Sequence, residues 1–162
     1  MAQLKLPSTV VSRADAMRLL REINSLDDFF AGAAARKGGT PLQPPKTTKM
    51  LDQLGEINGL NLLDADSRKT LYEQLETLSR QAPSLHLSFA NEPSPKAVEP
   101  ILLWLREQIH PNCLVQTGVA PAIAAGCILR TPNKVFDMSM RVHLQKQAHF
   151  LNELIAGAIN GR

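Results

Sequence analysis

Apolar residues in the first half of the chain recur at helical spacing. Ser12 and Asp15 form the pattern of a capping box, in which two side chains satisfy the free N–H groups at a helix start. The apolar positions that follow share one helix face: Ala16, Leu19, Leu20, Ile23, Leu26 and Phe30. The pattern therefore predicts a helix from residue 12 that ends before Gly38 and Gly39.

Two more helices are predicted before residue 82. One spans Thr48 to Ile57, and its inward positions are expected to be Met50, Leu51, Leu54 and Ile57. The other begins at an Asp64 cap and runs to about Arg80, with the inward positions Leu71, Leu75 and Leu78. The link at 38–47 is rich in proline and glycine, which interrupt helices. Residues 1–82 are thus expected to form a small helical domain.

The period of the pattern changes after residue 83. Residues 85–90 alternate as a half-buried strand does. A helix should follow, capped by Ser94 and beginning at Pro95, or else starting at Glu99 and Pro100 because a proline inside a helix kinks it. The remaining predicted elements are strands at 113–120, 123–130 and 134–138 and a helix from Ser139 to about Ile159.

The order of these elements indicates the architecture of residues 83–162. A strand, helix and strand in succession should pair in parallel with a right-handed crossover. The turn at Pro132 and Asn133 is short enough only for an antiparallel hairpin. We therefore predict an α+β protein, in which a small helical domain precedes a β-α-β-β-β-α domain with a mixed sheet covered by two helices.

Composition narrows the protein class. The chain has 162 residues, of which 44% are hydrophobic and 4% aromatic, enough for a core built mainly of aliphatic side chains. The net charge of +3 is spread along the chain rather than gathered in the dense basic stripe of a dedicated nucleic-acid binder. The sequence has no signal-peptide pattern and no apolar run long enough to span a bilayer. A cytoplasmic location is expected.

The sequence carries no pattern typical of catalysis or cofactor binding. The single glycine of "AAGC" is too few for a phosphate loop, and Gly126 is better read as a bulge or a close backbone contact. The histidines and cysteines lack metal-ligand spacing, and no GxSxG motif surrounds Ser139. We expect Ser139 to cap the last helix and Asp137 to complement its dipole. Phe136 is expected in the core. No enzyme, metal or cofactor is predicted.

A protein-binding surface is the remaining interpretation. Arg130, Lys134 and Arg141 gather around the hairpin and the start of the last helix. Leu144 and Leu151 belong to the apolar stripe of that helix. These residues suit an acidic or amphipathic partner helix. The alternative is a solvated basic rim beside an ordinary core helix.

The stretch "LVQTGVAPAIAAGCILRTPNKVFDMSMRVHLQK" resembles the C-terminal signature of the delta subunit of F-type ATP synthases, the homologue of the mitochondrial oligomycin-sensitivity-conferring protein. The resemblance covers roughly residues 84–147. The matching positions are Pro121, Ile123, Ala125, Gly126, Ile128, Arg130, Lys134, Asp137, Ser139, Arg141 and Leu144. The chain departs from the family in having Ala125 where a glycine is usual, and three predicted helices where the family has a six-helix domain.

The resemblance implies a non-catalytic peripheral-stalk subunit that links the catalytic head to the membrane-anchored b subunit. It implies the b subunit, and alpha subunits through the first domain, as partners. Membrane association at the inner face of the cell membrane would arise only through the complex, with no small-molecule substrate and no nucleic acid. Two alternatives stay open: another stator adaptor, similar to the V-type E subunit or the flagellar export stator protein, and a small RNA-binding α/β module.

Overall fold

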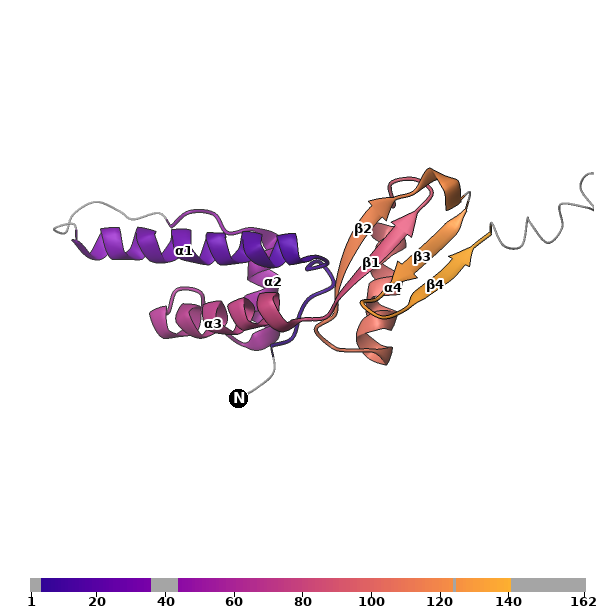
Figure 1. Cartoon of the computed structure of the whole chain (residues 1–162). Coiled ribbons are helices and arrows are strands. Elements are labelled where there is room, and N and C mark those ends of the chain that lie inside the picture. The colour runs from indigo at the N-terminus through magenta and orange to yellow at the C-terminus, as the bar shows by residue number, and fades with distance from the viewer. Residues whose placement is uncertain (1–3, 36–43, 124, 141–162) are drawn as a thin grey trace, which may run out of the picture. The chain divides into compact units, whose positions relative to one another are not determined.

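A computed structural model describes residues 4–35, 44–123 and 125–140. The described chain divides into two compact units, one comprising 4–35, 44–84 and 96–116 and the other 85–95, 117–123 and 125–140. Helices fill the N-terminal region, and a mixed four-stranded sheet follows. The predicted α+β class is therefore confirmed (Figure 1). Most of the expected helix at 139–159 and most of the link at 38–47 lie outside the described residues; Ser139 itself is the last residue of strand β4.

The N-terminal region contains the three predicted helices. They are α1 (Arg13–Ala35), α2 (Lys49–Asn58) and α3 (Ala65–Gln81). Helices α1 and α3 lie side by side (Figure 1). Their apolar stripes form one core, to which Leu19, Ile23, Leu54, Leu71 and Leu75 contribute fully buried side chains. Ile57 was expected inward but is 48% exposed, because it lies in the last turn of α2, beyond the part of that helix that reaches the core.

The ends of these helices follow from local hydrogen bonds. At α1 the Ser12 N–H donates to the Asp15 carboxylate over 2.9 Å, and the Asp15 N–H donates back to the Ser12 hydroxyl over 3.3 Å. This is the predicted capping box. At α2 the Thr48 side chain accepts from the Leu51 N–H. Gly59 ends that helix in the left-handed region at φ 64°, where glycine carries no steric penalty.

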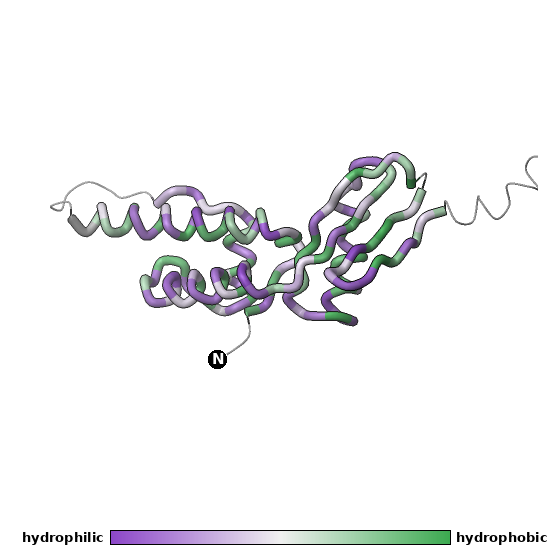
Figure 2. The backbone as a smooth tube through the Cα atoms, in the orientation of Figure 1, coloured by the Kyte–Doolittle hydropathy of each residue, from purple (hydrophilic) through white to green (hydrophobic). Residues whose placement is uncertain are grey.

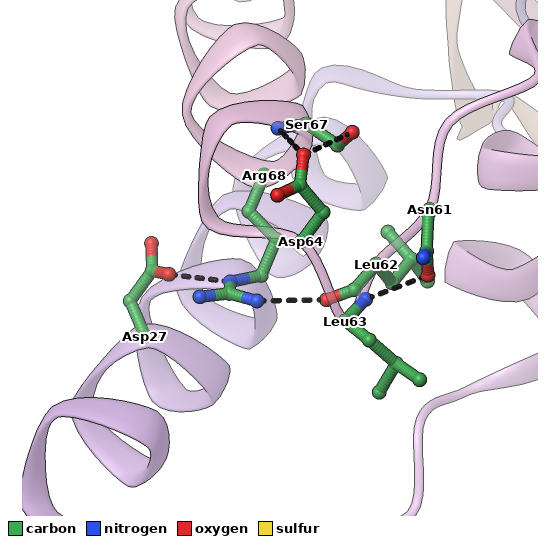
Figure 3. Close-up of polar contacts among 7 residues, drawn as sticks. All are labelled: Asp27, Asn61, Leu62, Leu63, Asp64, Ser67 and Arg68. Atoms are coloured by element: carbon green, nitrogen blue, oxygen red, sulfur yellow. Dashed lines mark hydrogen bonds and ion pairs between the residues drawn. The ribbon is translucent and has the colours of Figure 1, made fainter. Parts of the chain in front are cut away.

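Asp64 caps α3 and makes part of the stability depend on pH. Its carboxylate accepts hydrogen bonds from the hydroxyl and the N–H of Ser67, which lower the pKa of Asp64 below its usual 3.8 (Figure 3). A carboxyl whose pKa is lowered by folding stabilises the fold above its unfolded pKa, and this contribution is lost as the pH falls through the folded pKa.

We therefore expect the wild-type chain to unfold at a higher temperature than Asp64→Asn at neutral pH. Asparagine is a good cap but carries no charge to interact with the helix dipole. The difference between the two melting temperatures should shrink as the pH falls well below 3.8. Thermal unfolding followed by circular dichroism across this range measures it, and a difference that persists unchanged at low pH would contradict the assignment.

Arg68 joins α3 to α1 from a buried position. Its Nε donates to the Asp27 carboxylate at 2.5 Å, and its Nη1 donates to the Leu62 carbonyl at 3.0 Å (Figure 3). Its guanidinium also lies 4.5 Å from the centre of the Phe30 ring. The Arg68 side chain is 4% exposed, whereas that of Asp27 is 44% exposed. The charge is thus removed from water but bonded on both sides of the guanidinium.

Replacing Arg68 with methionine should lower the free energy of unfolding by about 2 kcal/mol. Methionine fills a similar volume, but the Leu62 carbonyl loses its charged donor, and an unpaired buried acceptor costs roughly 1–3 kcal/mol. Arg80→Met is the matched control, because Arg80 makes an exposed ion pair with Glu76 on the same helix. Its effect should stay within about 0.5 kcal/mol. Equal losses in urea unfolding of the two variants would contradict this role for Arg68.

Arg106 ties the N-terminal segment to the rest of the first unit. It lies in α4 (Pro95–Gln108). Its guanidinium donates to four backbone carbonyls, those of Leu6, Pro7, Val10 and Cys113, over 2.5–3.4 Å. Burial lowers the pKa of Arg106. Sequence patterns do not indicate this contact, because the acceptors on residues 6–10 lie about a hundred positions away along the chain.

The sheet comprises β1 (Ser84–Phe89), β2 (Leu114–Val119), β3 (Gly126–Arg130) and β4 (Val135–Ser139), in the order β2-β1-β3-β4. Strands β1 and β2 run parallel: the Leu114 N–H bonds the Pro83 carbonyl, and the Ala120 N–H bonds that of Phe89. Strand β3 pairs antiparallel with both β1 and β4. Figure 2 shows hydrophobic residues, in green, along the strands of the sheet.

The start of β3 differs from the prediction, whereas the start of α4 agrees with one of the two alternatives. Strand β3 begins at Gly126 rather than at Ile123, because Ile123 belongs to the 3₁₀ turn η1 (Pro121–Ile123). Helix α4 begins at Pro95 and contains Pro100 in its interior. Ile109, directly after the end of α4, is 50% exposed.

Candidate functional site

The β3–β4 hairpin contains most of the residues that the sequence singled out. Its strands pair from Gly126 opposite Ser139 to Arg130 opposite Val135. The four-residue loop 131–134 is closed by the Thr131 N–H bonding the Lys134 carbonyl at 2.8 Å. The Lys134 N–H donates to the Thr131 hydroxyl at 2.9 Å. The predicted antiparallel hairpin is confirmed, and its closed loop fixes the position of both basic residues relative to the strands.

Gly126, opposite Ser139, leaves no room for a side chain between the two strands. Its φ is +89°, in the region that other residues adopt only under strain. A Cβ atom there would lie 2.5 Å from the Met138 carbonyl oxygen and 3.0 Å from the Ser139 Cα. The close backbone contact predicted from the sequence is therefore present, at the first residue of β3. Beside it, the Met140 N–H donates to the Ala125 carbonyl at 2.8 Å and continues the pairing.

Arg130 and Lys134 lie close in sequence at the loop end of the hairpin, and both side chains are exposed. Arg130 pairs with His86 on β1 and with Val135 on β4, so these three side chains share one face of the sheet. On the same face Gly118 leaves room for the imidazole of His86, since a Cβ atom on Gly118 would lie 2.9 Å from Nε2. The side chains of Arg130 and Lys134 are thus accessible at the loop end of the hairpin.

Asp137 and Ser139 are linked within β4. The Ser139 N–H donates to the Asp137 carboxylate at 2.9 Å, a local bond typical of an Asp before a change in chain direction. Asp137 is exposed, whereas Ser139 is 4% exposed. The Ser139 Oγ has no hydrogen-bond partner among the described residues. The capping role of Ser139 concerns a helix outside those residues and stays a prediction.

Strand β4 exposes apolar side chains, which the sequence analysis missed. Phe136 was expected in the core but is 46% exposed, with Val135 at 64% and Met138 at 53%. The reason is topological, because β4 lies at the edge of the sheet and has a neighbouring strand on one side only. The consecutive apolar pair Val135 and Phe136, which points to both faces of the sheet, was the one sequence signal for such an edge.

The other predicted site residues are dispersed or not described. Pro121 begins η1 and is exposed, with no charged residue beside it in the chain. Arg141, Leu144 and Leu151 lie outside the described residues, so their predicted roles stay predictions. The structure therefore brings together Gly126, Asp137 and Ser139 at one end of the hairpin.

The described residues show no further reactive cluster. No group of three or more His, Cys, Asp or Glu side chains in residues 4–35, 44–123 and 125–140 could hold a metal ion. Cys113 and Cys127 are both free thiols. Burial raises the pKa of each thiol, so both are less reactive than a fully exposed cysteine.

Within the part of the chain that the structure describes, none of the helices has the length and hydrophobicity needed to cross a bilayer. Comparison with protein-family models found no match, and comparison with curated proteins found no significant similarity. The function is therefore inferred from the hairpin itself and from the resemblance of residues 84–147 to the delta-subunit signature.

Proposed function

We propose that this chain is a non-catalytic peripheral-stalk subunit that resembles the delta subunit of F-type ATP synthases. In this role it links the catalytic head to the membrane-anchored b subunit and resists the torque of the rotor. It contacts the membrane only through that complex and stays on the cytoplasmic side. Its work is mechanical, so the relevant property is the strength of its protein contacts.

The observation that carries the proposal is the surface of the β3–β4 hairpin. Arg130 and Lys134 are exposed at its loop end, and Val135, which shares a face of the sheet with Arg130, is 64% exposed. Basic and apolar side chains on one face suit an amphipathic helix with acidic residues, which is a common mode of helix recognition. The hydrogen bonds that close the loop 131–134 hold the backbone that carries these side chains, as a force-bearing contact requires.

Direct titration with the b subunit of the same organism tests the proposal. The full chain should bind the helical end of b, and the charge-reversed pair Arg130→Glu and Lys134→Glu should weaken binding by about tenfold or more, or at least about 1.4 kcal/mol. The matched control is Lys69→Glu with Lys96→Glu, two exposed lysines in α3 and α4. Equal affinity of both double variants, or no binding of the wild-type chain, contradicts the proposed contact.

The RNA-binding alternative has one observation in its favour. Phe89 and Phe136 share one face of the sheet, since they pair with Cys127 and Leu129 on β3. Arg130, however, belongs to the opposite face, so the aromatic and basic groups do not form one platform. Tight, strongly salt-dependent binding of single-stranded RNA by the wild-type chain would favour this alternative over the stalk role.

A further inference from the structure

A cavity of about 440 Å³ lies between helix α1 and the segment that leads into α2. Arg18, Arg21 and Ser25 line it from α1, where spacings of three and four residues place them on one face of the helix. Lys46 lines it from the segment before α2. All of these residues belong to the first unit of the chain. The volume of the cavity is typical of a small-molecule site, which measures roughly 300–1,000 Å³.

The three cations at this cavity have no acidic partner within the part of the chain that the structure describes. Arg18, Arg21 and Lys46 make no ion pair there, and all three side chains are exposed. The Nε of Arg21 donates to the Met17 carbonyl at 3.3 Å, so its two terminal nitrogens take no part in that bond. Cations that converge without a counter-charge repel one another, and a bound anion relieves this repulsion.

The carboxylate of Glu22, which also lines the cavity, is engaged by the backbone and side chain of Thr48. One of its oxygens accepts the Thr48 N–H at 2.5 Å, and the other accepts the Thr48 hydroxyl at 2.8 Å. These bonds hold the segment beside α1 at a point two residues after Lys46. Three positive side chains and one negative side chain give the described lining a formal charge of +2. The cavity therefore favours an anion with two negative charges.

We infer that the cavity binds a phosphomonoester group, carried by a small soluble molecule or by a lipid headgroup. A phosphomonoester carries a charge of roughly −1.5 to −2 at pH 7 and three strong acceptor oxygens. Its charge therefore balances the formal charge of the lining. Arg18 and Arg21 donate paired hydrogen bonds to phosphate oxygens, and Lys46 adds a compact positive charge. The hydroxyl of Ser25 is a further donor.

The remaining lining residues distinguish this ligand from a nucleic acid. None of the described residues that line the cavity is aromatic, whereas proteins that bind single strands stack the bases on aromatic rings. Leu26, whose side chain is buried, and Pro45 provide a small apolar surface beside the cations. The cavity also lies outside residues 84–147, which carry the resemblance, so phosphate binding and the stalk role are independent.

Two titrations of the full chain distinguish the sources of the phosphate group. Isothermal titration calorimetry with inorganic phosphate, at constant ionic strength, tests binding to a soluble source. Sedimentation with phosphatidylcholine vesicles that contain phosphatidic acid, compared with vesicles of phosphatidylcholine alone, tests the lipid source. Binding of inorganic phosphate supports a soluble ligand, and binding of the phosphatidic acid vesicles alone supports a headgroup. Binding of neither probe overturns the inference.

Arg18→Gln with Lys46→Gln should weaken binding of the phosphate or of the phosphatidic acid vesicles by at least about tenfold, because two of the three cations are lost. The matched control is Arg13→Gln with Lys69→Gln, which removes the same two residue types from exposed positions of α1 and α3 outside the lining. The affinity of the control should stay within about twofold of the wild type, since salt screens distant exposed charges. Circular dichroism checks that both variants stay folded, and equal losses of affinity overturn the inference.

The reactivity of Lys46 in the native chain locates the bound phosphate group. At about ten times the Kd of the probe that binds, roughly nine sites in ten are occupied, so acylation of Lys46 by an amine-reactive ester should slow by at least about fivefold. Lys69 is the internal control, and its rate of acylation should not change. Mass spectrometry of the digested chain measures both rates. Equal protection of the two lysines, or no protection of Lys46, overturns the inference even if the b subunit binds as proposed.

Discussion

Replacing Arg106 with alanine is expected to lower the free energy of unfolding by about 3–5 kcal/mol. The guanidinium donates to the carbonyls of Leu6, Pro7, Val10 and Cys113, and alanine leaves all four without this donor. Hydrogen bonds to charged groups contribute roughly 1.5–3 kcal/mol each, and a buried acceptor without a partner adds a desolvation cost. Water that enters the vacated space limits the total.

Arg106→Lys separates the role of the charge from that of the planar donor array. Lysine keeps the charge but has one nitrogen, which cannot reach four separated carbonyls, so most of the loss should remain. Urea unfolding measures the free energy of unfolding of both variants. The Val10 amide bonds the Pro7 carbonyl, so its rate of hydrogen exchange should be higher in both variants than in the wild type. A loss below about 1 kcal/mol for Arg106→Ala would show that these bonds do not hold the N-terminal segment.

Gly126→Ala should have the second largest effect, a loss of about 2–4 kcal/mol. The backbone at φ +89° costs a residue with a Cβ atom roughly 1–3 kcal/mol. The new methyl group would also lie 2.5 Å from the Met138 carbonyl oxygen, which belongs to the backbone of the paired strand. Relief of the clash requires β3 and β4 to separate at the pair of Gly126 and Ser139.

Two other glycines provide controls for this prediction. Gly32 lies within α1 with open space around it, so Gly32→Ala should be neutral or stabilise the chain by up to about 1 kcal/mol. Gly118→Ala would meet only the imidazole of His86, a side chain that can move, and should cost less than Gly126→Ala. The order of the three unfolding free energies is the result to measure. A neutral Gly126→Ala would contradict the described backbone.

The helices were predictable because their signals are local. The Ser12 and Asp15 capping box and the Asp64 cap are read within four residues, and the structure confirms both starts. The β3–β4 hairpin followed from the short turn between its strands, and the parallel pair β1 and β2 followed from the order strand, helix, strand. The caps and the hairpin depend on contacts that the nearby sequence specifies.

The features that were missed depend on distant partners. Arg68 and Arg106 had no sequence signal that marked them, and each is bonded to groups on other elements. Phe136 read as core because an alternating pattern does not reveal which strand ends at the edge of the sheet. The exposure of Phe136 follows from the strand order. The candidate surface therefore includes the whole of β4 as well as the basic residues.

The predictions for individual residues of the β3–β4 hairpin have different outcomes. Gly126 was expected to allow a close backbone contact, and this contact is observed. The expected interaction of Asp137 with the dipole of the last helix stays a prediction, because that helix lies outside the described residues. The roles of Arg141, Leu144 and Leu151 stay predictions. The residues that match the family pattern thus have mainly structural roles in the hairpin, whereas the exposed surface beside them carries the functional proposal.

Co-purification from native membranes tests the stalk role most directly. The full chain, tagged at its N-terminus and produced in its own cells, is recovered from membranes solubilised in a mild detergent. The account predicts that ATP synthase alpha, beta and b subunits are recovered together with it, and that the Arg130→Glu and Lys134→Glu double variant loses b. Recovery of V-type or flagellar export components, of RNA with ribosomal proteins, or of the chain alone would contradict the account.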